Sequence, residues 1–209
     1  MRKYILILLM GLMAFTATAQ TRVSAAEQTR MVSQIESAAA AMKSMQCDFQ
    51  QTKTLALLTS KMQSKGRMYY SGGKLLRWEY TSPYSYIFII NSGKVLMKNG
   101  AKSSTLDTKS SKLFQEITRI MMNSVTGRCL SSKTDFSVVM LKKGNDWIAQ
   151  LTPLKKELKA IFSSLTLHFD ATQKVVTEVE MKEKSGDTTV IRLQNIKKNT
   201  TIASSLFQL

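Results

Sequence analysis

The residue types that most often carry out chemistry in proteins are scarce in this sequence. It contains one histidine, His168, and two cysteines, Cys47 and Cys129, which lie far apart in the chain. Zinc ligands normally occur as closely spaced pairs, and a nucleophilic side chain needs a base beside it. His168 lies in the alternating stretch LTLHFD, which is typical of a β-strand with that side chain facing outward. The sequence therefore predicts no catalytic residue, no metal ligand and no cofactor; an acyl-ester hydrolase with His168 as its base is the alternative among enzymes.

The beginning of the chain, MRKYILILLMGLMAFTATA, predicts export from the cytoplasm. Two basic residues precede an apolar run over 4–15, and Ala-Thr-Ala at 17–19 is a typical cleavage signal. The run is shorter than the roughly 20 residues that span a bilayer. We therefore expect a signal peptide over 1–19 and a single periplasmic domain over 20–209.

The two cysteines would then lie in an oxidising compartment, where a structural disulfide between Cys47 and Cys129 could form. Bridging requires that their Cα atoms come within about 7 Å, which the sequence does not reveal. The sequence does not decide whether this disulfide forms.

The expected mature chain is strongly basic. Removing Arg2 and Lys3 from 30 basic residues leaves 28 against 14 acidic ones, a formal charge of +14. This balance favours anionic partners. The lysines are scattered rather than gathered in a stripe, and an exported protein rarely meets nucleic acid, so anionic lipid headgroups or acidic proteins fit better. We expect a monomer that makes transient contact with membranes and binds no nucleic acid.

Hydrophobic periodicity divides the rest of the chain into two helices and a series of strands. The stretch 24–45 begins with Ser24 and Glu27 at capping-box spacing and continues with apolar residues at helical spacing. A second helix is predicted over 110–128, where Gly127 provides a stop. Alternation predicts strands over 47–58, 61–71, 74–81, 84–91, 94–98, 135–142, 146–152, 161–169, 174–183, 187–196 and 202–207, with one helical turn over 154–160.

A sheet with this many strands twists strongly and should curl. If the two helices pack their apolar faces on the concave face of the sheet, all of these apolar surfaces are buried at once. We therefore expect a mainly β (α+β) fold, an incomplete antiparallel β-barrel of about eleven strands with a helical lid covering its concave face.

Two consecutive predicted strands have an unusual distribution of apolar residues. Alternation places Leu76, Trp78 and Tyr80 on one face, and we interpret Arg77 on the other face as a solvated strand arginine. The next stretch, YSYIFII over 84–90, is apolar on both faces. Such a strand needs a cover on both faces or an empty apolar concavity on one of them. Ordinary core packing is one interpretation, but adaptable methionines on the predicted helices and central strands favour a cavity for an apolar passenger molecule.

Several spaced motifs run through the chain: CDFQQT at 47–52, Gly66, RWEYTSP at 77–83, Gly93, and a long stretch over 147–195 that contains LTP. This pattern resembles the periplasmic outer-membrane lipoprotein carrier family, the LolA-like proteins. The resemblance covers nearly the whole expected mature chain, and its most specific part is the box from RWEY to Pro83.

The resemblance implies an incomplete β-barrel of about eleven strands in which a helical lid closes over the acyl chains of lipoproteins. It implies that an ATP-driven release complex in the inner membrane supplies this cargo and that a receptor at the outer membrane accepts it. Members of the family commonly have a basic residue and a proline just before the RW pair, and the basic residue has been assigned a part in latching the lid. This chain has SGGK at 71–74, so Lys74 would have to replace that latch. Functions of a longer C-terminal tail are not carried over past Leu209.

The leading hypothesis is a periplasmic chaperone that carries acylated lipoproteins from the inner-membrane release complex to the outer-membrane receptor. The alternative is a lipid-binding or lipoprotein-sensing module of the same fold that transfers nothing. The residues expected to line the cavity are Phe49, Met68, Leu76, Trp78, Tyr80, Phe88, Ile90 and Met97. The residues expected on the lid are Val32, Ile35, Met42, Ile117, Met121 and Met122.

Overall fold

The computed structural model describes residues 20–58, 60–107 and 112–208, and the side chains at 112–114 and 117 lie outside that description, as does the expected signal peptide. The strands are β1 (Thr21–Arg22), β2 (Ser44–Leu55), β3 (Ser60–Ser71), β4 (Leu75–Ser82), β5 (Tyr86–Asn91), β6 (Lys94–Asn99), β7 (Lys102–Asp107), β8 (Phe136–Lys143), β9 (Asp146–Pro153), β10 (Phe162–Asp170), β11 (Val176–Glu183) and β12 (Thr188–Lys198). The helices are α1 (Ala25–Ala41), α2 (Lys112–Thr126) and α3 (Lys156–Lys159), with 3₁₀ helices η2 (Arg128–Ser131) and η3 (Ser204–Phe207).

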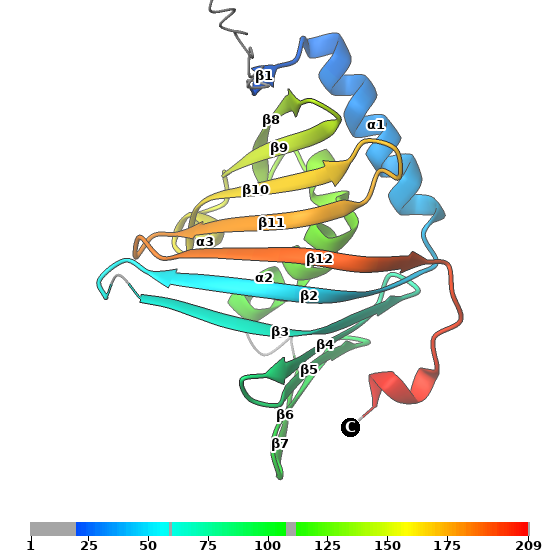
Figure 1. Cartoon of the computed structure of the whole chain (residues 1–209), viewed down its shortest axis with the longest axis vertical. Helices are drawn as coiled ribbons and strands as arrows, with labels where there is room; N and C mark the ends of the chain where they lie inside the picture. The colour runs from blue at the N-terminus through cyan, green and yellow to red at the C-terminus, as the bar shows by residue number, and fades with distance from the viewer. Residues whose placement is uncertain (1–19, 59, 108–111, 209) are drawn as a thin grey trace, which may run out of the picture.

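The strands form one twelve-stranded antiparallel sheet in the order β1-β8-β9-β10-β11-β12-β2-β3-β4-β5-β6-β7. Because the order begins at β1 and ends at β7, the sheet is an open shell, which Figure 1 shows as strongly twisted. The pairing of β12 with β2 joins the second half of the chain to the first. The expected mainly β, incomplete antiparallel barrel is therefore confirmed, with twelve strands in place of about eleven.

The two long helices differ in position. In Figure 1, α2 lies behind the middle of the sheet, whereas α1 runs along one end of the strands. The Oγ of Ser24 accepts a hydrogen bond from the backbone N–H of Glu27, as the capping spacing predicts. Gly127 ends α2 with φ +78°, and a Cβ there would lie 2.8 Å from both Ile35 and Phe169. Glycine is thus required where α2 turns toward α1. None of the helices among the described residues has the length and apolarity to cross a membrane.

Some predicted boundaries were wrong for identifiable reasons. The first helix ends at Ala41; Met42 and Lys43 connect it to β2, which begins at Ser44. Alternation misses β1, which is only two residues long, and β7, whose sequence KSSTLD is exposed throughout. The stretch 202–207 is no strand; its last four residues form η3, which packs on β4 and β5.

The C-terminal segment covers the outer face of β4 and β5. Ile89 is on that face by alternation and is fully buried, as is Phe207 of η3, which contacts both strands. The side chain of Arg77 donates a 3.1 Å hydrogen bond to the carbonyl of Leu206, and Asn91 donates one to Phe207. The interpretation of Arg77 as a solvated arginine is wrong, since its side chain is only 12% exposed. The outer face of β5 is therefore apolar because this C-terminal segment packs on it.

Candidate functional site

A cavity of about 440 Å³ lies between the concave face of the sheet and α2. Its volume falls within the range of roughly 300–1,000 Å³ that is usual for small-molecule pockets. Most of its wall is apolar; the exceptions are Gln51, Ser124 and Glu183, the tyrosine hydroxyls and the indole N–H of Trp78. The lining residues are Gln51, Trp78, Tyr80, Tyr86, Phe88, Ile120, Met121, Ser124, Val125, Ile161, Phe162, Val179, Met181, Glu183, Ile191 and Leu193.

Three of the residues expected to line a cavity lie in its wall: Trp78, Tyr80 and Phe88. The other five lie on the same face of the sheet but not in the wall. The strand register pairs Met68 with Trp78 and Phe88 with Met97, so each pair shares one row of side chains. The five residues outside the wall are Phe49, Met68 and Leu76, which are fully buried in the core, Ile90, which is buried, and Met97, which is partly buried.

The helical cover is made mainly by α2. Met121 lines the cavity, whereas its neighbour Met122 lines a separate shallow pocket beside Gly73 and Ile90. The expected lid residues of the first helical segment do not reach the cavity, because α1 packs on η2 and β8 at the end of the sheet. There Ile35 and Met42 are buried in the core and Val32 packs against it, while the side chain of Ile117 lies outside the described residues.

The opposite wall comes from the second half of the chain, which sequence reasoning did not assign to the site. Val179 and Met181 of β11 and Ile191 and Leu193 of β12 face α2 across the cavity. Alternation in 174–183 and 187–196 places these side chains on one face of each strand, so the signal was present. What the sequence does not contain is the pairing of β12 with β2, which sets this face beside Trp78.

A cluster of aromatic rings makes the first wall rigid. The ring of Phe49 lies 4.4 Å from that of Trp78 and packs edge-on against Tyr80 at 5.2 Å. Phe49 can approach this closely because Gly66 lies beneath it, where a Cβ would come within 2.7 Å of the Phe49 ring. The Tyr80 hydroxyl donates a 3.0 Å hydrogen bond to Gln51, and burial raises its pKa, so it stays neutral.

Two polar atoms in the wall, Trp78 Nε1 and Ser124 Oγ, are buried with no hydrogen-bond partner of ordinary geometry among the described residues. Trp78 comes from the sheet and Ser124 from α2, so the two atoms belong to facing walls. Buried polar groups are normally paired, and an unpaired one is costly.

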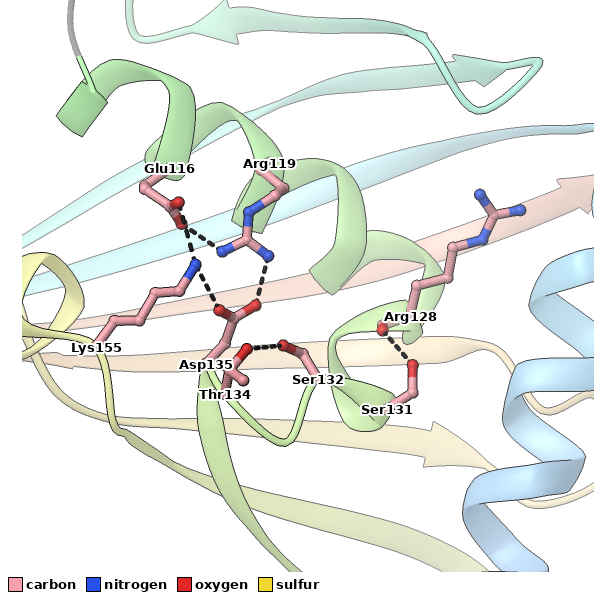
Figure 2. Close-up of polar contacts among 8 residues, drawn as sticks. All are labelled: Glu116, Arg119, Arg128, Ser131, Ser132, Thr134, Asp135 and Lys155. Carbon is pink, nitrogen blue, oxygen red and sulfur yellow. Dashed lines mark hydrogen bonds and ion pairs between the residues drawn. The ribbon is translucent and has the colours of Figure 1, made fainter.

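The first half of α2 is fastened by a network of charges at one end of the cavity (Figure 2). Glu116 and Arg119 of α2 meet Asp135, which precedes β8, and Lys155, which precedes α3. Lys155 Nζ lies 2.9 Å from Asp135 and 3.3 Å from Glu116, and the Asp135 side chain is only 3% exposed. Burial by itself raises the pKa of Asp135, but hydrogen bonds from Arg119, Ser132 and Lys155 outweigh it and lower the pKa to about 2.

The second end of α2 is tied to α1. Arg128, which follows Gly127, donates a 3.0 Å hydrogen bond to the carbonyl of Ala39 near the end of α1, and its own carbonyl accepts one from Ser131 (Figure 2). Lys74, which was expected to replace a basic residue that latches the lid, is exposed in a turn. The contacts that hold α2 therefore come from Arg119 and Arg128, which lie on and beside the helix itself.

The residue types considered for catalysis lie elsewhere. Both cysteines are free in this structure, so the disulfide that the sequence left undecided is not formed. Both thiols are buried, which raises the pKa of each to about 12. His168 lies on β10 with its Nε2 3.8 Å from a carboxylate oxygen of Glu178, and it is not part of the cavity wall. Within the described residues, no group of three acidic, histidine or cysteine side chains could hold a metal ion.

Comparison with known proteins gives a family for the greater part of the chain. Residues 40–209 match the sequence profile of the family described as outer membrane lipoprotein carrier protein LolA. No curated protein matches the chain.

Solved structures show the fold at low identity. An uncharacterized conserved protein from Thermus thermophilus is 9% identical with a TM-score of 0.55, covering 88% of this chain and 93% of its own. The lipoprotein LppX from Mycobacterium tuberculosis is 11% identical with a TM-score of 0.51, covering 86% and 99%. A chain of the MucA/MucB complex from Pseudomonas aeruginosa is 9% identical with a TM-score of 0.50, covering 88% and 61%.

Proposed function

Because the chain belongs to the family of the outer membrane lipoprotein carrier protein LolA, we propose that it carries lipoproteins through the periplasm with their acyl chains in its cavity. The apolar cavity between the sheet and α2 is the observation that carries this proposal. On this proposal, residues 1–19 direct export, 20–209 form the carrier domain, an inner-membrane release complex supplies the cargo and an outer-membrane receptor accepts it.

The physical need for a carrier follows from the cost of exposing hydrocarbon to water. At about 0.8 kcal/mol for each methylene, an acyl chain of some sixteen carbons costs on the order of 12 kcal/mol in water. A lipoprotein anchor has up to three such chains. Free diffusion between membranes is therefore excluded, whereas a cavity that matched the bilayer completely would not release its cargo. A wall that is partly complementary, with one adaptable side that includes Met121, meets both requirements.

The closed cavity is small for such an anchor. Its 440 Å³ lies toward the lower end of the range for sites that take a single small molecule. A cargo with several acyl chains needs more room, and α2 is the element that can provide it, since the sheet behind the cavity is held by continuous strand pairing. Loading then requires α2 to move away from β11 and β12.

Two neighbouring methionines of α2 provide a matched test. In Met121→Trp the larger side chain fills the cavity, whereas in Met122→Trp it points to the separate pocket beside Ile90. We expect Met121→Trp to weaken binding of a fluorescent fatty acid by about fifteenfold, because excluding two methylenes costs about 1.6 kcal/mol. Met122→Trp should bind as the wild type does. Equal affinity of both variants, with both folded by circular dichroism, would show that the cavity does not hold the acyl chain.

A lipid-binding or sensing module that does not transfer its ligand is the alternative. The same fold occurs in a chain of the MucA/MucB complex. The two functions differ in one measurement, the release of radiolabelled lipoprotein from inner-membrane vesicles into the soluble fraction. A carrier accumulates lipoprotein in a soluble complex in proportion to its own concentration, whereas a sensor binds fatty acid but leaves the lipoprotein in the vesicles. Mass spectrometry of what co-purifies from the periplasm checks the cargo: acylated lipoproteins support the carrier, and free lipid alone supports the sensor.

A further inference from the structure

One end of the strands forms a continuous rim. The antiparallel register places the turn after β2, the turn after β4, the connection from β9 to β10 and the turn after β11 at the same end of the sheet. We call this the mouth rim and define it by residues 56–58, 83–85, 154–161 and 184–187, with the first residues of β3. Figure 1 shows the turns after β2 and after β11 close together at the left. Asp187 fixes these two turns to each other by accepting a 3.0 Å hydrogen bond from the backbone N–H of Ala56.

The large apolar side chains that the described residues expose are concentrated on the mouth rim. Leu57 is 93% exposed, so the described part of the chain leaves almost its whole side chain uncovered. Leu106 is an exception, since it pairs with Val95 toward the opposite end of the strands. The six exposed side chains are Leu57 (93%), Leu58 (68%), Tyr84 (57%), Met62 (50%), Leu154 (43%) and Leu106 (40%), and all but Leu106 belong to the mouth rim.

The cavity extends to the same rim. Tyr86 begins β5, Phe162 begins β10 after Ile161, and Glu183 ends β11, and all four line the cavity while remaining partly exposed. The residues that line its other end, such as Leu193, are buried. The mouth of the cavity is therefore surrounded by the exposed apolar turns.

The rim is also basic. The two carboxylates nearest the turn after β2, Glu183 and Asp187, are both bound by Lys53, at 2.9 and 3.6 Å. Glu157 of α3 is the other acidic residue of the rim. Exposed lysines surround the apolar turns: Lys61, Lys65, Lys156, Lys159 and Lys184.

We propose that the mouth rim docks on the surface of an anionic lipid bilayer, with Leu57 and Leu58 inserted among the headgroups and the lysines on the lipid phosphates. This inference rests on the proposed function, because a carrier must bring its cavity mouth to a membrane to be loaded. The side-chain composition favours a bilayer over a protein partner: protein interface cores are depleted of lysine, whereas apolar residues flanked by lysine are typical of segments that bind the membrane interface. Apolar tips spread over several turns of one rim also suit a planar surface better than a groove.

The test is flotation of the chain purified from the periplasm with vesicles of phosphatidylcholine alone or mixed with phosphatidylglycerol. We expect binding to the mixed vesicles that weakens with added salt. The double variant Leu57→Asp, Leu58→Asp should lose this binding, while Leu106→Asp, at the other end of the strands, should keep it. Because both leucines are exposed, the double variant should fold as the wild type does, which its melting temperature checks.

A second pair of variants tests the charges. Lys61→Glu with Lys184→Glu should weaken binding to the mixed vesicles by about fivefold or more for each lysine. Lys94→Glu with Lys143→Glu, at the opposite end, should change it little. Equal losses in both pairs would overturn the proposal, as would binding that appears only when inner-membrane proteins are present in the vesicles, since the partner would then be a protein.

Fatty-acid binding in solution separates this inference from the proposed function. The rim variants should keep it, because none of the substituted residues lines the cavity. A chain that binds fatty acid but floats with neither kind of vesicle would overturn the docking surface alone. A chain that floats with anionic vesicles but binds no fatty acid would support the docking surface and overturn the carrier.

Discussion

Trp78 belongs to a row of side chains on neighbouring strands, part of which lines the cavity. Strand pairing sets it between Met68 and Phe88, and the ring of Phe49 packs against it from below. Trp78 belongs both to the core and to the cavity wall, so a side chain's place on the concave face does not by itself decide whether it contacts a ligand. At the residue scale, burial depth separates Met68, which is fully buried, from Phe88, which is only partly so.

The buried thiols give a prediction at this scale. Burial raises the pKa of both Cys47 and Cys129 to about 12, so the reactive thiolate is nearly absent at neutral pH. We expect neither thiol to react with iodoacetamide in the folded protein and both to react in guanidinium chloride, as measured by the mass of the intact chain. Rapid alkylation of the native protein would contradict the structure, and a mass lower by two hydrogen atoms would reveal a disulfide.

At the element scale, α2 is a helix held by polar contacts at two places. Its amphipathic sequence explains why it covers an apolar face, but its position depends on Arg119 in its middle and on Arg128, two residues after its end. The stretch between these two arginines carries the cavity-lining Met121 and Val125, whose apolar side chains make no such contact. An element fastened in this way can release its ion network while the tie to α1 is kept, so we expect α2 to open as a hinge about Gly127.

Asp135→Asn tests the network. The change leaves Arg119 and Lys155 without their buried anion, and we expect a loss of about 3 kcal/mol in the free energy of unfolding. Hydrogen exchange of the α2 amides should accelerate more than that of the central strands. Asp146→Asn, an exposed carboxylate at the opposite end of the strands, is the control and should change neither quantity.

The same carboxylate predicts the pH response of the lid. Because the pKa of Asp135 is lowered to about 2 in the folded protein, its stabilising contribution is complete above its unfolded pKa of about 3.9 and is lost as the pH falls toward 2. Exchange of the α2 amides, corrected for its intrinsic pH dependence, should therefore show constant protection between pH 5 and 8. Lid opening that grows between pH 7 and 5 would show that another group controls it.

At the scale of the whole molecule, both faces of the β4–β5 pair are covered by different means. The concave face meets the core and the cavity, and the convex face is closed by η3, which Arg77 and Asn91 hold by its backbone carbonyls. The last described residues of the chain thus stabilise the strands that carry Trp78 and Phe88, without contact with the cavity.

Phe207→Ala separates this support from binding. Removing a fully buried phenylalanine side chain should lower the free energy of unfolding by about 3–5 kcal/mol, as measured by denaturation in urea. The affinity for fatty acid, measured where the variant is still folded, should remain close to that of the wild type. Gln208→Ala, at the exposed neighbouring residue, should be neutral in both assays. A loss of affinity without a loss of stability would mean that η3 takes part in the site.

The sequence predicted the part of the site whose pattern is local. The box around RWEY located Trp78 and Tyr80 on the concave face, and both line the cavity. It did not separate them from Leu76, two residues away on the same face, which is buried in the core. The second wall, with Val179 and Ile191, was absent from the expected site, although apolar residues alternate clearly in the sequence of both strands.

By itself, the sequence determined the open antiparallel sheet, its helical cover and the face on which each strand side chain lies, because the period of two along a strand is a local property. Only the tertiary structure decided which of those side chains border the cavity, that α2 rather than α1 covers it, and that the cavity opens among exposed leucines and lysines. These features depend on the pairing of β12 with β2 and on contacts such as that of Arg119 with Asp135. Such contacts join residues that no periodicity relates, and their geometry follows from the packing of the whole chain.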